Sequence, residues 1–178
     1  MARTTKYNSQ GAWHNLDTEE EVLPEEVPSR HSKARARGNY LFFASQHEYE
    51  VYLALRDSYP KERVLCHQKV IVKPVSKGFG SISWTVDFLV KDEVGDFWIE
   101  AKGFTTREFI FKLILCEEFN PEVYQNLLMV FPNKTNTLDK LTKKLRNNQL
   151  TCITISQLRR FLKHGKVLAS ILQSKSAV

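Results

Sequence analysis

Cysteine is scarce in this chain of 178 residues, and its scarcity excludes several classes of protein. The three cysteines, Cys66, Cys116 and Cys152, are far apart and form no Cys-x-x-Cys pair. The five histidines do not have the spacing of zinc ligands. We therefore expect neither a disulfide framework nor a structural zinc site. The thiols are expected to be reduced core residues of an intracellular, cytoplasmic protein.

Long apolar runs are also absent. No stretch reaches the length that crosses a bilayer, and Met1–Thr5 is not followed by the apolar core of a secretory signal. We expect no membrane partner and no small-molecule cofactor. The chain also lacks an aromatic-rich RNP motif and a Gly-x-x-Gly clamp, so an RNA-binding module ranks low.

Acidic residues are nearly missing from one end of the chain. From Leu138 to Val178 one acid, Asp139, stands against nine basic residues, while the whole chain has a formal net charge of +6. Such an excess suits a polyanionic partner, most simply DNA, and the alternative is a solvated face that favours solubility. The predicted DNA contacts are Arg35, Arg37, Lys140, Lys143, Lys144, Arg146, Arg159 and Arg160.

Residues 1–38 contain few apolar side chains. An acidic patch from Asp17 to Glu26 is interrupted by Pro24, and a basic stretch follows that ends at Gly38. Because so little apolar surface is available for burial, we expect residues 1–38 to form a flexible charged arm. Residues 39–178 are expected to form one globular domain with a basic C-terminal segment.

Apolar periodicity predicts the order of elements in the globular part. Helices are expected over 46–58, from a Thr105/Glu108 capping box to 119, over 138–146, and from a cap at Ser156 onward. Strands are expected over 64–73, 84–90, 97–102, 125–131 and 150–155, with a hairpin turn at 92–96. This order predicts an α/β fold with a central mixed β-sheet flanked by helices.

Two of the predicted strands carry charged residues among apolar neighbours. Asp87 lies in the run Trp84–Val90, and Glu100 and Lys102 lie in the next run. Because strand side chains alternate, Glu100 and Lys102 point the same way. Two carboxylates and an amine on one sheet face can hold Mg²⁺ against a phosphate and orient a water. The alternative is a surface strand, although strands this apolar are usually buried, where an acid needs a partner or a metal.

Two further polar residues are candidates for the same site. Glu48 shares a helix face with Val51 and Leu55, which should be buried. A glutamate there either points into a metal site or reaches water from the edge of the apolar stripe. Gln68, on the strand before the two charged strands, is a further candidate catalytic residue.

Taken together, these motifs resemble the phage endonuclease I family of Holliday-junction resolvases, within the PD-(D/E)xK nuclease superfamily. The segment from Ser45 to Glu48 is similar to the family's Ser-x-x-Glu. Trp84-Thr85-Val86-Asp87-Phe88-Leu89 is similar to its Tyr-x-Pro-Asp-Phe-Leu strand, and Trp98-Ile99-Glu100-Ala101-Lys102-Gly103 to its Val-Glu-x-Lys-Gly strand. The similarity runs from about Phe43 to about Ser156. Val86 replaces the usual proline, and the arm and the C-terminal extension have no counterpart.

The resemblance implies a restriction-endonuclease-like core and Mg²⁺-dependent hydrolysis of DNA phosphodiester bonds by a homodimer, most simply on branched DNA. It implies metal ligation by Asp87, Glu100 and the Ala101 carbonyl, with Glu48 assisting and Lys102 orienting the attacking water. Mn²⁺ is expected to substitute for Mg²⁺, and a phage-encoded protein acting inside a host cell is implied. Two alternatives stay open: a sequence-specific endonuclease of homing, restriction or transposon type, and a catalytically idle DNA-binding or virion assembly protein.

Overall fold

The computed structural model describes residues 11–27, 36–133, 150–164 and Leu168. In this part of the chain, no helix is long and apolar enough to cross a membrane. The chain divides into two compact units, Met1–Glu50 and Val51–Val178. The expected helix over 138–146 lies outside the described residues, as do the candidate DNA contacts Arg35, Lys140, Lys143, Lys144 and Arg146.

The first unit contains a small antiparallel sheet. Its strands, in the order β2-β1-β4-β3, are Glu21–Val22, Ala12–Asn15, Tyr40–Phe43 and Ala36–Arg37. The buried His14 ring stacks on Tyr49 with ring centroids 3.7 Å apart. The chain therefore does not divide after residue 38 as the sequence suggested, because β4 pairs with β1 and β3 from the expected arm. An apolar side chain of the expected arm finds its partner on β4, because the Trp13 ring lies against Phe42 with centroids 5.5 Å apart.

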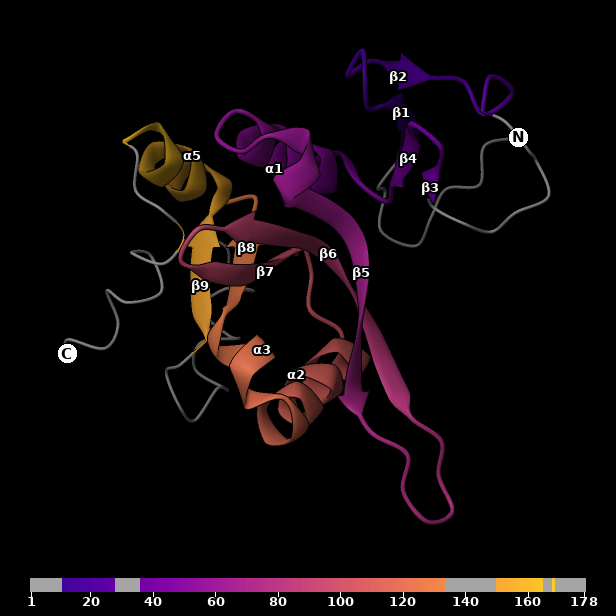
Figure 1. Cartoon of the computed structure of the whole chain (residues 1–178), viewed down its shortest axis with the longest axis vertical. Helices are drawn as coiled ribbons and strands as arrows, with labels where there is room; N and C mark the ends of the chain where they lie inside the picture. Colours follow the sequence, from indigo (N-terminus) through magenta and orange to yellow (C-terminus); the bar gives the residue numbers. More distant parts are fainter. Residues whose placement is uncertain (1–10, 28–35, 134–149, 165–167, 169–178) are drawn as a thin grey trace. The chain divides into compact units, whose positions relative to one another are not determined.

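The second unit is built on a five-stranded mixed sheet (Figure 1). Its strands are β5 (Val64–Lys73), β6 (Ile82–Asp92), β7 (Gly95–Ala101), β8 (Leu127–Phe131) and β9 (Thr151–Thr154), in that order across the sheet. β6 pairs antiparallel with both β5 and β7, and β8 pairs parallel with both β7 and β9. The predicted mixed sheet is confirmed.

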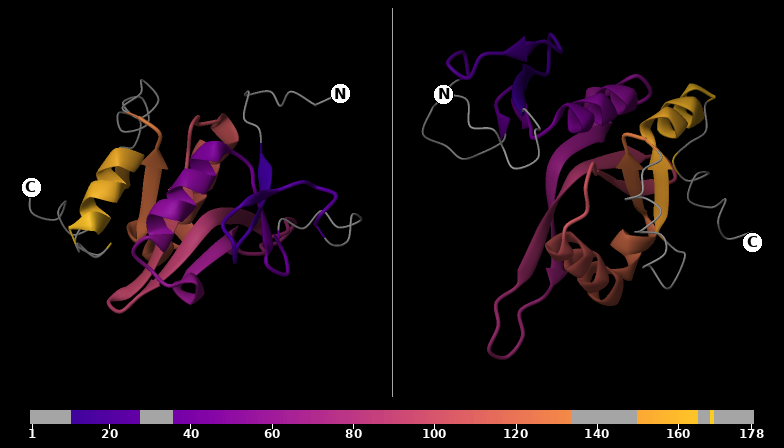
Figure 2. Two further views of the ribbon diagram at one scale, coloured as in Figure 1. Left: turned by 90° about the horizontal axis from the view of Figure 1, so that it is seen from above. Right: turned by 180° about the vertical axis from the view of Figure 1, so that it is seen from behind.

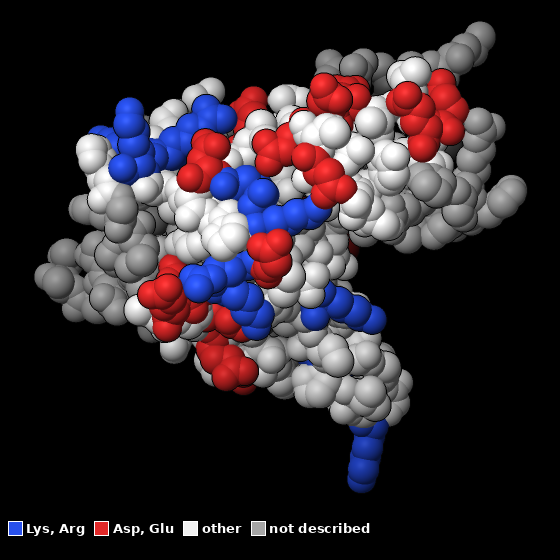
Figure 3. Space-filling model, turned by 45° about the horizontal axis from the view of Figure 1, so that its top comes forward, with Lys and Arg blue, Asp and Glu red and all other residues white. Residues whose placement is uncertain are grey.

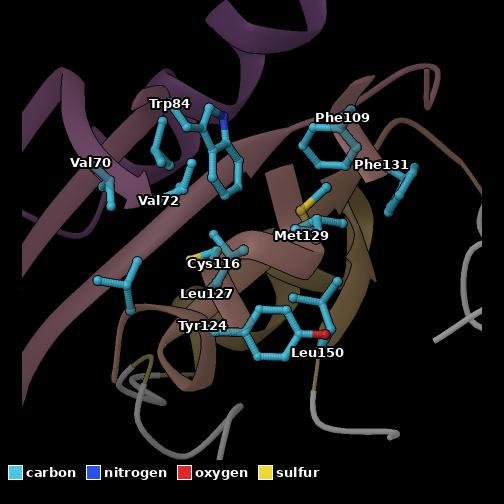
Figure 4. Packing of buried hydrophobic residues seen from close by; sticks show 13 residues of the cluster. Val70, Val72, Trp84, Phe109, Cys116, Tyr124, Leu127, Met129, Phe131 and Leu150 are labelled. Atoms are coloured by element: carbon cyan, nitrogen blue, oxygen red, sulfur yellow. The ribbon is translucent and has the colours of Figure 1, made fainter. Parts of the chain in front are cut away.

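Helices cover both faces of this sheet (Figures 1 and 2). On one face lie α2 (Arg107–Phe119) and α3 (Pro121–Gln125). On the other lie α5 (Ile155–Lys163) and the second half of α1 (Gln46–Arg56), which begins in the first unit; the short 3-10 helix Lys61–Arg63 precedes β5. Between the sheet and α2 is a buried apolar cluster, shown in Figure 4, that includes Val70, Trp84, Phe109, Cys116, Met129 and Phe131.

Two helix starts differ from the prediction by one or two residues. The hydroxyl of Thr106, not Thr105, caps α2 by accepting a hydrogen bond from the Phe109 amide at 3.1 Å. Thr154, not Ser156, caps α5 and forms a capping box with Gln157. Both caps have the extended backbone that an N-cap requires, and the sequence alone does not distinguish neighbouring hydroxyl residues.

Candidate active site

The candidate site lies where β6 and β7 separate. The two strands pair regularly from Asp92 and Gly95 as far as Phe88 and Ile99. Continuing this register by one residue brings Asp87 opposite Glu100. Here the Ala101 amide donates to Oδ2 of Asp87 at 2.9 Å, and the Asp87 amide donates to Oε2 of Glu100 at 3.3 Å. Side-chain carboxylates thus bind the amides at the split, and the two acids of the sequence motif are brought together.

The backbone next to Asp87 is irregular on its other side as well. The pairing of β5 with β6 includes Cys66 with Phe88 and Gln68 with Val86, so the register places His67 opposite Asp87. His67 has φ of 53°, in the left-handed region that residues other than glycine seldom occupy. Such strain is often stored at functional sites, and here it lies beside the candidate acid.

The alternation of side chains along β6 also changes at Asp87. Trp84 and Val86 belong to the cluster packed against α2. Phe88, two residues further on, instead stacks on Tyr52 of α1, with ring centroids 6.3 Å apart. Regular alternation would place all three on the same face. Asp87 therefore lies where the strand reverses the faces of its side chains.

Lys102 and Glu100 form an ion pair on the α2 side of the split. Lys102 Nζ lies 2.7 Å from Glu100 Oε1, and the Glu100 and Lys102 side chains are 3% and 27% exposed. A carboxylate buried to this extent needs such a partner, because desolvation otherwise strongly disfavours its charge. The predicted set of Asp87, Glu100 and Lys102 is thus assembled on two adjoining strands.

Sequence reasoning missed Phe109, which lies beneath the lysine. Lys102 Nζ is 4.4 Å from the centroid of the Phe109 ring, within range of a cation–π contact. Phe109 is in the first turn of α2, and its amide is the one bound by the Thr106 cap. The signal in the sequence was the apolar spacing of Phe109, Leu113 and Cys116, which marks the buried face of this helix.

Gln68 is close to Asp87 in the strand register but has a local hydrogen bond. Its side-chain Nε2 donates to the Cys66 carbonyl at 2.8 Å, on the same strand. This contact holds the amide along β5 at the irregularity around His67. Its catalytic role stays a prediction.

Glu48 is buried, as its place on the apolar helix face predicted, with only 4% of its surface exposed. Its Oε2 accepts a hydrogen bond from the Ala44 amide at 2.8 Å, and its own amide donates to Ser45 Oγ at 3.1 Å. These bonds cap the start of α1. Glu48 belongs to the first compact unit and Asp87, Glu100 and Lys102 to the second, so its participation in the site stays a prediction.

The donor set at the split fits Mg²⁺ better than zinc. No group of three or more His, Cys, Asp or Glu side chains is arranged to hold a metal within the residues that the structure describes. Asp87 and Glu100 offer carboxylate oxygens, and the third predicted ligand, the Ala101 carbonyl, belongs to the residue whose amide binds Asp87. Mg²⁺ is usually held by one or two carboxylates with water completing its shell, whereas structural zinc needs four protein ligands.

The described candidate DNA contacts lie on other elements. Arg159 and Arg160 are exposed on α5 together with Lys163, and basic side chains gather over this helix in Figure 3. This helix follows β9, at the opposite edge of the sheet from β5. Arg37 is in β3 of the first unit, in register with Tyr40.

No protein-family model matches the chain, and no curated protein is significantly similar to it. The assignment of a family and a function therefore rests on the residues and their geometry.

Proposed function

We propose that the protein is a metal-dependent DNA endonuclease of the PD-(D/E)xK superfamily that cleaves branched DNA. One observation carries the proposal: the separation of β6 and β7 at Asp87, where the buried Glu100 carboxylate is bound by Lys102. A sheet built only for stability gains little from a buried ion pair at a break in its hydrogen-bonding ladder.

In this proposal, Asp87, Glu100 and the Ala101 carbonyl would hold Mg²⁺. Bound there, the metal would supply positive charge against the negative charge that develops during phosphodiester hydrolysis. The Ala101 and Asp87 amides orient the two carboxylates through the hydrogen bonds already present. Preorganised groups of this kind need no rearrangement during the reaction.

The Lys102 ammonium orients the attacking water and offsets the negative charge that develops on the phosphate. Its contacts with Glu100 and the Phe109 ring fix the end of a side chain that is otherwise flexible. The net charge of +6 favours association with DNA. A homodimer with one site per subunit would make the paired cuts that resolve a four-way junction.

The test is a cleavage assay with the purified full-length chain. A synthetic four-way junction and a linear duplex of the same sequence are incubated with Mg²⁺ or with EDTA. We expect paired cuts near the branch in Mg²⁺ only, with the duplex spared. One cut in a long duplex would instead indicate a sequence-specific endonuclease, and tight binding without any cleavage would indicate an idle fold.

Lys102→Ala tests the assigned mechanism in the same assay. We expect this variant to lose cleavage while it still binds the junction. Lys91→Ala is the matched control, because Lys91 forms its ion pair with Asp96 at the other end of the same hairpin. Cleavage retained in Lys102→Ala would remove this lysine from the mechanism.

A further inference from the structure

The tip of the β5–β6 hairpin extends beyond α2 and α3 in Figures 1 and 2. The two strands stay paired as far as Lys73 and Ile82, with a bulge between Ile71 and Lys73. The hairpin is fastened to the helical layer, since the Asn120 side-chain Nδ2 donates to the Ile71 carbonyl at 2.7 Å. Residues 74–81 form the tip.

The tip has a defined turn. Ser76 and Phe79 exchange backbone hydrogen bonds of 3.1 and 3.0 Å, and Gly78 has φ of 86°, which favours glycine. Lys73 Nζ donates to Ser76 Oγ at 2.7 Å and to the Pro74 carbonyl at 3.2 Å. The side chains of the tip are therefore presented by a hydrogen-bonded turn.

This turn presents apolar side chains to water. Val75 and Phe79 are each 75% exposed, more than any other large apolar side chain in the described residues. Ile71, nearer the base, is 52% exposed. An exposed phenyl ring forgoes the free energy of burial, and clustered exposed apolar groups usually mark a binding surface.

The charged residues of the hairpin itself are all of one sign. Between Val64 and Val86 the only Asp, Glu, Lys or Arg residues are Lys69, Lys73 and Lys77. Lys69 and Lys77 are exposed. Two copies of such a tip would repel each other. An acidic protein could form ion pairs with the lysines, but it offers no regular contact for the Phe79 ring. DNA offers both phosphates for the lysines and base faces for the ring.

The spacing suits a duplex held at the proposed site. From Ile82 to Asp87 along β6 is roughly 17 Å at about 3.3 Å per residue. One turn of B-DNA spans about 34 Å. A duplex held at Asp87 and running along β6 would therefore meet the tip about half a turn away.

We propose that the β5–β6 tip is a DNA wedge, in which Phe79 stacks on a base at a branch or bend while Lys69 and Lys77 contact phosphates. Apolar wedges of this kind unstack base steps in other DNA-binding proteins. The proposal deepens the endonuclease function and depends on it for the choice of branched DNA as ligand.

The experiment uses the full-length chain and a four-way junction carrying 2-aminopurine at the branch, in EDTA so that no cleavage occurs. Wild-type protein should change the fluorescence of the probe. Phe79→Ser should abolish this change and weaken binding about tenfold, while Phe79→Trp should preserve both. Phe111→Ser, which removes a ring 54% exposed on α2, is the matched control and should have neither effect.

A second variant tests the phosphate contacts. Lys77→Ala should lower the slope of log affinity against log salt concentration by about one. Phe111→Ser should leave this slope unchanged. An unchanged slope in Lys77→Ala would overturn the phosphate contact.

Cleavage of the same junction in Mg²⁺ separates the wedge from the nuclease. If wild-type protein cleaves and Phe79→Ser behaves as wild type in fluorescence and binding, the wedge is overturned and the nuclease stands. If the Phe79-dependent fluorescence change occurs without cleavage by the wild type, the nuclease fails and the wedge stands. A dimer that becomes a monomer in Phe79→Ser, measured by sedimentation, would make the tip a protein contact and overturn the wedge.

Discussion

The two ends of the β6–β7 hairpin carry the same chemical pair in different settings. At the turn end, Lys91 and Asp96 are cross-strand partners 2.5 Å apart, and both side chains are 47% exposed. At the split end, Lys102 and Glu100 are 2.7 Å apart, with side chains 27% and 3% exposed. The distance from the lysine Nζ to the carboxylate oxygen is therefore the same within a few tenths of an ångström. The two pairs differ in how deeply their side chains are buried.

Burial changes what each ion pair contributes to the free energy of unfolding. An exposed lysine–carboxylate pair is worth well under about 1 kcal/mol, because water and salt screen it. A buried pair must first offset the desolvation of both charges, so it often stabilises no more than apolar side chains of the same size. The turn-end pair is thus an ordinary surface contact, whereas the split-end pair is best explained by the chemistry proposed for it.

The largest expected contrast is in cleavage. Glu100→Gln keeps the shape of the side chain and an acceptor for Lys102, but it removes the negative charge proposed to hold Mg²⁺. We expect junction cleavage to fall by about a thousandfold, within the range seen when one electrostatic group of an active site is lost. Asp96→Asn, the equivalent change at the turn end, should leave the rate unchanged. Equal rates in both variants would mean that the two ends do not differ in function.

The second contrast is in stability. Glu100→Ala leaves the Lys102 ammonium without this carboxylate, and we expect the free energy of unfolding to fall by about 2 kcal/mol. This is below the usual loss for a fully buried pair, because Lys102 is 27% exposed and reaches water. Asp96→Ala should change it by less than about 0.5 kcal/mol. Urea denaturation of both variants measures the difference, and a similar loss in each would contradict the comparison.

A double variant tests whether the buried pair of Glu100 and Lys102 is needed for stability. Replacing it with apolar side chains, Glu100→Leu with Lys102→Met, should restore the free energy of unfolding to within about 1 kcal/mol of wild type. Cleavage should remain absent. A double variant as unstable as Glu100→Ala would show instead that the pair is a structural element.

The smallest expected effect concerns the helix that supports the split end. Thr106→Ala removes the N-cap of α2, whose first turn supplies Phe109 beneath Lys102, and should cost about 1 kcal/mol in unfolding free energy. Thr105→Ala changes the neighbouring hydroxyl and should have almost no effect. Thermal or urea unfolding distinguishes the two variants. A larger loss of unfolding free energy in Thr105→Ala than in Thr106→Ala would support the Thr105/Glu108 capping box that the sequence predicted.

Much of the second unit was predictable from apolar patterning. The strand expected over 64–73 is β5 without change, and the strand expected over 84–90 lies within β6. The small sheet of the first unit was not predicted, because its few apolar residues find partners on β4, beyond the expected boundary. Composition reports how much apolar surface a segment has, but not which distant segment covers it.

The sequence by itself determined which residues carry charge within apolar strands, and that Glu100 and Lys102 share a strand face, because side-chain alternation is a local property of the backbone. Only the tertiary structure decided that β6 and β7 separate at Asp87, and that the ring of Phe109 lies under the lysine. It also decided that Phe79 is exposed at the tip of a hairpin held by Asn120. These features depend on pairing and packing between segments far apart in the chain, which no local pattern specifies.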